Sequence, residues 1–239
     1  MDEQLTSGLV LRQTFSVYFS NFLSFSLIST LVLLPVLAVS ALQFAQVARG
    51  EGQSVGLSLL AGLLSILLGP VVTAALTYGV FQQIRGKPAT LLDCIGTGFR
   101  LLPSVLGVSI ITGLAIIAGA VLCFFPGFIV ACALAAAVPA AVIERPGVFA
   151  ALHRSRTLTE GHRWSVFGAI FGIWLLQIFG NLSILGLSRL APVLVRSAIS
   201  LILMVVFSTL QATAPALIYY HLRRIKESID VAEIVAVFD

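Results

Sequence analysis

Long runs without a charged residue alternate along this chain with short segments that hold its charges. A helix needs about 20 mostly apolar residues to cross the hydrocarbon core of a bilayer. The uncharged runs reach this length and predict membrane spans at about 21–44, 55–81, 102–124, 128–143, 164–188 and 197–222.

The run from 101 to 143 is too long for one crossing and just long enough for two. The segment FFPGF at 124–128 divides it, because proline cannot continue the helical hydrogen bonds and glycine readily closes a turn. We expect two full crossings here. The alternative is a re-entrant hairpin, which would need protein packed around it.

Composition agrees with this pattern. Of the 239 residues, 59% are hydrophobic and 10% are charged, whereas a soluble domain carries about 25% charged residues. The mean hydropathy is +1.07. The sequence therefore predicts an all-α, polytopic helical membrane protein with about six spans. It would form one domain over residues 1–239, with amphipathic interfacial helices besides the spans.

The distribution of Lys and Arg predicts the orientation. With a cytoplasmic N-terminus, eleven of the 14 basic residues lie on the inner side and only Arg49, Arg189 and Arg196 lie outside. Basic loops are retained in the cytoplasm, so both termini are expected there. Because the basic residues lie between spans, topology explains the net charge of +4 better than nucleic-acid binding does.

Two segments have the pattern of interfacial helices. Residues 5–22 carry aromatic side chains at helical spacing and are expected along the inner surface. In VFAALHRSRTLT, 148–159, Val148, Phe149, Leu152, Ser155 and Leu158 would share one face against the lipid surface. The segment GTGFR at 96–100 is interpreted as a cytoplasmic turn.

GAIFG, 168–172, is a small-xxx-small motif that lets another helix approach closely. Its partner is expected to be another span of the same chain, with a second subunit as the alternative.

Three groups of polar residues are candidate sites. Arginine forks suit phosphate, and basic residues between spans four and five could contact lipid headgroups or another anion: Arg154, Arg156, His162 and Arg163. Glu144 ends a span and needs a cationic partner, for which the candidates are Arg145, Arg154 and Arg223. A polar path for a solute could be lined by Thr73, Gln177, Asn181 and Gln211.

No sequence motif for catalysis, metal binding or cofactor binding is present. The three histidines and three cysteines lack metal-ligand spacing. No Asp, Glu, Lys or Arg lies near the centre of a span, which disfavours a proton-coupled carrier. An enzyme acting on lipid headgroups would depend on Glu144 together with His153 or His162.

The order of several short motifs resembles a bacterial inner-membrane family. The motifs are FFPGF, VIERPG, ALHRSRTLTEGHRW and IYYHLRRIKESID. The family includes YciC-like proteins and the membrane domain fused to some glycerophosphodiester phosphodiesterases. This resemblance implies a multi-pass helical domain in the bacterial inner (plasma) membrane. It implies no phosphodiesterase activity, because the catalytic domain of the fused members is a separate soluble barrel.

The sequence thus favours a non-enzymatic membrane protein with a structural, accessory or lipid-interacting role and a basic cytoplasmic face. The expected partners are membrane lipids and either a protein partner or a second copy of the chain; neither nucleic acid nor a cofactor is expected. The alternative is a transporter or channel for a small neutral or amphipathic solute.

Overall fold

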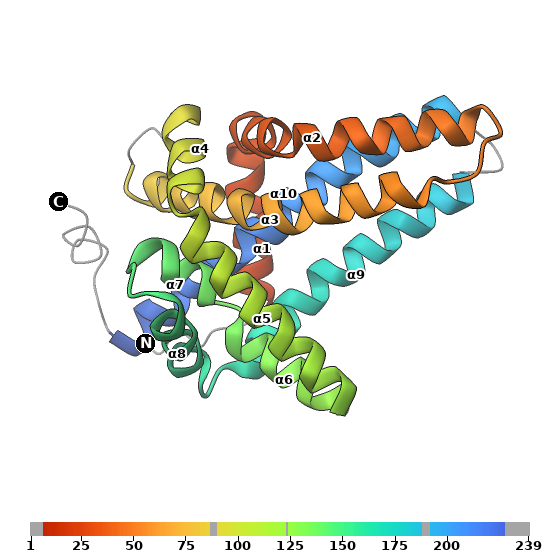
Figure 1. The fold of residues 1–239 in the computed structure, drawn as a ribbon. Coiled ribbons are helices and arrows are strands. Elements are labelled where there is room, and N and C mark those ends of the chain that lie inside the picture. The colour runs from red at the N-terminus through yellow and green to blue at the C-terminus, as the bar shows by residue number, and fades with distance from the viewer. Residues whose placement is uncertain (1–6, 87–89, 123, 188–191, 228–239) are drawn as a thin grey trace.

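The computed structural model describes residues 7–86, 90–122, 124–187 and 192–227, and the regular elements in these ranges are all helices (Figure 1). They are α1 (Ser7–Ser20), α2 (Phe22–Ala48), α3 (Val55–Ile84), α4 (Leu91–Arg100), α5 (Leu102–Leu122), α6 (Phe124–Leu134), α7 (Ala137–Ile143), α8 (Val148–Thr159), α9 (Arg163–Leu187) and α10 (Val193–Glu227). Six segments are long and apolar enough to cross a membrane. The chain is a polytopic, all-α protein, as predicted.

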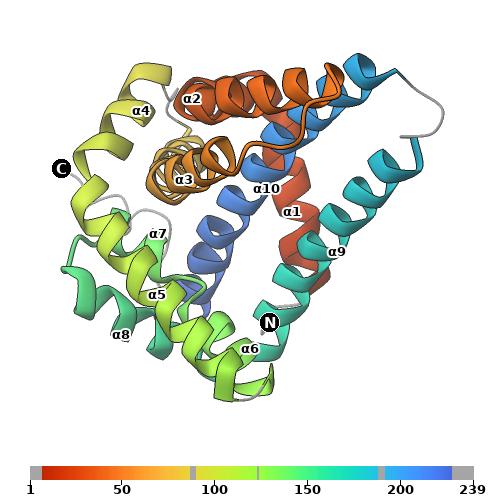
Figure 2. The ribbon, with the colours of Figure 1, turned by 45° about the vertical axis from the view of Figure 1, so that its right-hand side comes forward.

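The centre of the bundle is α10, which contacts α1, α2, α3, α7, α8 and α9 (Figure 2). Its 35 residues extend about 52 Å at 1.5 Å per residue, well beyond the about 30 Å of a hydrocarbon core. Small residues let α3 approach it closely, including Ala74 and Ala75 of α3 and Ala216 of α10, all fully buried. The Thr209 hydroxyl also hydrogen-bonds that of Ser29 of α2 at 2.8 Å.

The segment expected as the fourth span is not one helix. A break at Ala135–Ala136 separates α6 from α7, but Pro126–Ile143 is still one of the six segments that are long and apolar enough to cross a membrane. With 11 residues, α6 extends about 16 Å, half of a crossing. It packs against α5, where a Cβ on Gly119 would lie 2.9 Å from the Gly127 Cα. The C-terminal end of α5 and the N-terminal end of α6 point away from the other helix ends in the bundle (Figures 1 and 2). Those ends are the C-terminus of α2 and the N-termini of α3 and α10.

Helix α1 packs closely against the GAIFG motif of α9. A Cβ on Gly168 would lie 2.8 Å from the Ser7 Cβ, and one on Gly172 would lie 2.9 Å from Leu11 Cδ1. The motif's partner is therefore in the same chain, and it is the N-terminal helix rather than a candidate span. Helix α1 crosses α9 and α10 instead of running along them (Figure 2).

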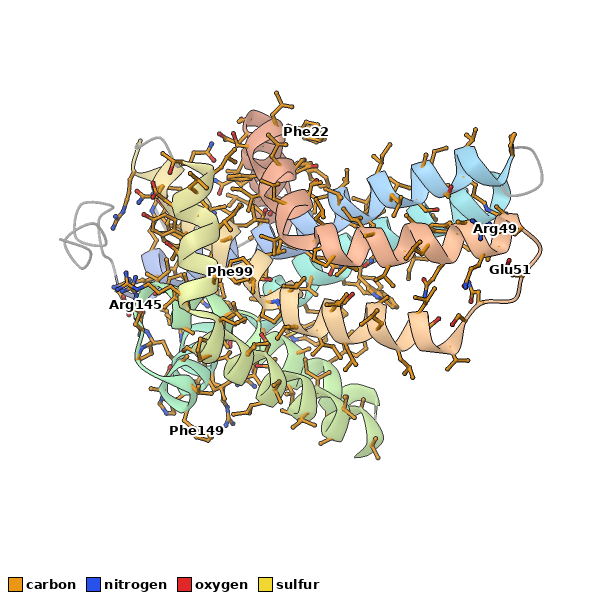
Figure 3. The ribbon with its side chains drawn as sticks, turned by 45° about the horizontal axis from the view of Figure 1, so that its top comes forward. Phe22, Arg49, Glu51, Phe99, Arg145 and Phe149 are labelled. Carbon is orange, nitrogen blue, oxygen red and sulfur yellow. The ribbon has the colours of Figure 1, made fainter. Side chains whose placement is uncertain are left out.

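Two expectations about the connecting segments are corrected. Residues 96–100 belong to α4, a helix whose Gly98 packs against α3: a Cβ there would lie 2.9 Å from the carbonyl oxygen of Val71. In α8, Phe149 is 78% exposed and points away from the bundle (Figure 3), while Ala151 is buried instead. The buried face of α8 packs against α5, α6, α7 and α10, so protein rather than lipid covers it.

Candidate functional site

Charged and polar side chains from three helices meet where α7 ends. Glu144 is the C-cap of α7, Arg154 belongs to α8, and α10 contributes Tyr219, Arg223 and Glu227 at a spacing of four residues, which places them on one helix face. We call these five residues the polar clasp.

The hydrogen bonds of the polar clasp form one connected network. Arg154 Nε donates to both carboxylate oxygens of Glu144, at 2.9 and 3.0 Å, and Arg154 Nη2 donates to Glu227. The Tyr219 hydroxyl donates to Glu144 Oε1 at 2.6 Å and accepts from Arg223 Nη1 at 3.4 Å. Arg223 Nε donates to Glu227 Oε2 at 2.8 Å. The clasp therefore ties α7, α8 and α10 together.

The charges of the clasp balance, with two arginines and two glutamates. Burial alone would lower the pKa of Arg154, but its hydrogen bonds to Glu227 and Glu144 outweigh burial and raise that pKa. Arg223 is only 8% exposed. Removing one partner would leave a poorly solvated charge, which is more costly than the intact pair is favourable.

The structure separates the three cations considered for Glu144. Arg154 pairs with it, and Arg223 pairs with Glu227 instead. Arg145 has a φ of 49° and is exposed in the turn that Gly147, φ 93°, completes before α8. Tyr219 and Glu227 were not expected as members of this ion-pair group, although the motif IYYHLRRIKESID, one of those that carry the family resemblance, contains both. The spacing of Tyr219, Arg223 and Glu227 was the available signal.

A second feature of α8 lies at the break between α6 and α7. The Ser155 hydroxyl accepts from the Ala136 N–H at 3.1 Å and donates to the Ala133 carbonyl at 2.8 Å. The Thr159 hydroxyl also contacts the Ala133 carbonyl, at 3.2 Å. A broken helix within apolar surroundings needs such partners for its freed backbone groups. Helix α8 supplies them, so it holds the broken helix in place.

The residues considered for anion contact do not form one cluster. Arg154 is occupied in the polar clasp, and Arg156 is exposed on α8. His162 and Arg163 lie where α9 begins, and His162 Nδ1 and Arg163 Nε are buried without a hydrogen-bond partner among the described residues. Arg163 borders an apolar groove of about 480 Å³ between α6 and α9.

The residues considered for a polar path are partly brought together. Gln177 and Asn181 of α9 and Gln211 of α10 line a groove of about 520 Å³, and Gln211 Nε2 donates to Gln177 Oε1. Thr73 is not among the lining residues; its hydroxyl donates to the Gly69 carbonyl within α3, at 3.2 Å. Three serines from α3 and α10 also line the groove, together with Met204 and Phe207: Ser65, Ser200 and Ser208.

Among the described residues, no group of three His, Cys, Asp or Glu side chains could hold a metal ion. The fold defines the chain as a multi-pass helical membrane protein. No protein-family model, curated protein or solved structure matches it. The family resemblance of the short motifs stays a prediction.

Proposed function

We propose that this chain is a non-enzymatic, lipid-interacting membrane protein of structural or accessory role. Its basic end, formed by the α7–α8 turn, α8 and the start of α9, would contact anionic headgroups at the cytoplasmic face of a bacterial inner membrane. The observation that carries the proposal is the uneven pairing of its cations. Arg154 is neutralised by Glu144 and Glu227, whereas Arg156 is exposed and Arg163 keeps a buried Nε without a partner among the described residues.

Unneutralised arginines at a membrane boundary favour anionic lipid for two reasons. The surface potential of anionic leaflets attracts juxtamembrane basic residues by about 1 kcal/mol each. A guanidinium also offers phosphate a planar set of donors, and in an anionic headgroup no cationic amine offsets the charge of that phosphate. Arg145 adds an exposed positive charge at the same end, far from Arg49 (Figure 3).

The polar clasp supports a structural role over an enzymatic one. An acid–base mechanism would need Glu144 available to a substrate. Its oxygens instead accept from Arg154 and Tyr219, and these contacts join three helices.

The test is the lipid that stays bound through purification. The Arg156→Gln/Arg163→Gln double variant is compared with the wild type and with Arg49→Gln, which changes an exposed arginine at the opposite end (Figure 3). Mass spectrometry should find the retained anionic-to-zwitterionic lipid ratio lowered about three- to tenfold in the double variant and unchanged in Arg49→Gln. A wild-type ratio equal to that of the source membrane would refute the proposal.

A second candidate function is passage of a small neutral or amphipathic solute, which the groove of Gln177, Asn181 and Gln211 favours. Asn181 is exposed in the structure, and an exposed amide facing hydrocarbon is unfavourable. If water fills this groove, Asn181→Cys should react with a membrane-impermeant thiol reagent, while Leu63→Cys on the exposed apolar surface of α3 should not. Equal labelling of the two positions would remove the support for a hydrated path.

A further inference from the structure

The groove between α6 and α9 has walls that are almost wholly apolar and aromatic. Four aromatic side chains follow one face of α9, and α6 contributes the facing wall with Phe128, Ile129 and Cys132. Neighbouring rings of the α9 row contact one another, with centroids 6.0, 5.3 and 6.0 Å apart: Trp164, Phe167, Phe171 and Trp174. The groove volume is about 480 Å³.

The length of the groove corresponds to one leaflet. From Arg163 to Trp174, α9 rises about 16 Å at 1.5 Å per residue, and half of a hydrocarbon core is about 15 Å. Helix α6, with 11 residues, has the same length. An acyl chain lying along α9 would therefore begin beside Arg163 and end near Trp174.

One end of the groove is charged. Arg163 is the lining residue with a charge, and its Nε is buried without a partner among the described residues. The nearest acid along the chain, Glu160, is exposed at the end of α8 and is in none of the ion pairs formed by the described residues. The adjacent His162 also has a buried nitrogen, Nδ1, without a partner in the described ranges. An anionic group at this end would satisfy donors that the protein leaves unused.

We propose that this groove is a selective site for one anionic phospholipid, with the phosphate at Arg163 and an acyl chain along the aromatic row. This inference rests on the proposed lipid-interacting function and assigns it a place and a lipid class. Bulk lipid would also fill an apolar groove, so the distinguishing property is headgroup selection by Arg163. The acyl chains of competing lipids are equally apolar and already lie in hydrocarbon, so contact with the rings does not affect that selection.

The two tryptophans of the protein, Trp164 and Trp174, both line this groove. Intrinsic fluorescence therefore reports on the groove directly, and lipids with brominated chains quench it on contact. The protein would be reconstituted in phosphatidylcholine containing a small, equal fraction of either brominated phosphatidylglycerol or brominated phosphatidylcholine. The wild type, Arg163→Gln and Arg156→Gln would be compared, since Arg156 is exposed and outside the groove.

We expect the groove to prefer the anionic lipid about fivefold, because phosphatidylcholine carries the same phosphate together with a cationic ammonium that offsets its charge. The preference should fall to about twofold or less in Arg163→Gln and persist in Arg156→Gln. Equal quenching by the two lipids in the wild type would overturn the site. An equal fall in both variants would also overturn it, because the selection would then come from general surface charge.

Bromine position gives a second readout. In the Trp174→Phe variant, where Trp164 remains, bromines near the headgroup should quench more than bromines deep in the chain. In Trp164→Phe the order should reverse. The same order in both variants would exclude a chain lying along α9. A wild type that retains anionic lipid through purification yet shows no selective quenching would leave the proposed function standing and remove only the groove.

Discussion

Replacing Ser155 by alanine tests whether α8 stabilises the broken helix. The Ser155 hydroxyl accepts a hydrogen bond from the Ala136 N–H, at 3.1 Å, and is one of two hydroxyls at the Ala133 carbonyl. In Ser155→Ala the carbonyl keeps Thr159 at 3.2 Å, but the N–H loses its partner. Ser155 and Ala136 are fully buried, so solvent cannot replace the lost contact.

The magnitude follows from that one unpaired donor. A buried polar group without a partner costs about 1–3 kcal/mol, while hydrogen bonds between membrane helices have contributed about 0.6 kcal/mol on average and at most about 1.7. The Ala136 N–H has a fixed position at the break and cannot move to a new acceptor. We therefore expect Ser155→Ala to lower the free energy of unfolding by about 1.5 kcal/mol.

The assay is reversible unfolding by sodium dodecyl sulfate in mixed micelles, followed by circular dichroism. Thr159→Val is the matched control: it removes the second hydroxyl from the Ala133 carbonyl but leaves Ser155 in place, and should cost about 0.5 kcal/mol. The double variant leaves the Ala133 carbonyl without either hydroxyl. Its loss of unfolding free energy should therefore exceed the sum of the losses in the two single variants. A Ser155→Ala loss below about 0.5 kcal/mol, or strict additivity, would refute this account of the break.

Three further outcomes are expected. Tyr219→Phe should lower the free energy of unfolding by about 1 kcal/mol, because Glu144 loses a donor at 2.6 Å but keeps Arg154; the same unfolding assay measures it. Gly172→Leu should displace α1 and speed amide exchange in 7–20, because a Cβ there would already lie 2.9 Å from Leu11 Cδ1. Burial raises the pKa of the Cys94 thiol from 9.0 to about 11, so its thiolate fraction at pH 7.5 should be about 100-fold below that of an unperturbed cysteine. Alkylation of Cys94 should be correspondingly slow and quicken about tenfold per pH unit up to about pH 11.

Each of these outcomes has its own control. Tyr220→Phe lies outside the polar clasp, and an equal loss there would point to the ring environment instead of the hydroxyl. Gly186→Leu adds the same side chain to α9 where nothing lies within 4 Å, and it should leave α1 unchanged. Cys94 should be alkylated rapidly after denaturation, in a variant whose other cysteines are alanine. Rapid alkylation of the native protein at pH 7.5 would contradict its burial.

The membrane spans could be predicted from sequence because each depends only on the apolar composition of its own segment. A run such as 55–84 is apolar in composition whatever surrounds it, and α3 occupies Val55–Ile84 against an expected span of about 55–81. The segment FFPGF at 124–128 likewise indicated that residues 101–143 double back, as α5 and α6 do. It was expected to be the turn itself, but its residues begin α6, because proline is tolerated in the first turn of a helix. Pro139 is a local signal for the break at Ala135–Ala136, because proline cannot bond to the carbonyl four residues before it. Sequence did not indicate that this proline ends a helix, since Pro35, Pro70 and Pro215 lie inside unbroken helices.

The break depends on side chains from α8. Ser155 lies 19 residues after Ala136 in sequence and provides the hydroxyl that the interrupted backbone needs. A local pattern contains no information about such a partner. For the same reason Phe149 was assigned to the buried face of α8: helical spacing defines a stripe but not which stripe meets protein.

Charge alone also left the role of each arginine open. The sequence placed Arg154, Arg156 and Arg163 in one basic connection, and the tertiary structure gave them three different surroundings. Arg154 meets Glu227, 73 residues away; Arg156 stays exposed; Arg163 borders the aromatic groove.

The sequence by itself determined the medium and the class of this protein, because transfer of a long apolar helix into lipid depends on the residues within that helix. Only the tertiary structure decided which polar groups are satisfied inside the protein and which remain available, since hydrogen bonds and ion pairs depend on where distant segments meet. The polar clasp forms where α7, α8 and α10 contact one another, and the groove forms between α6 and α9.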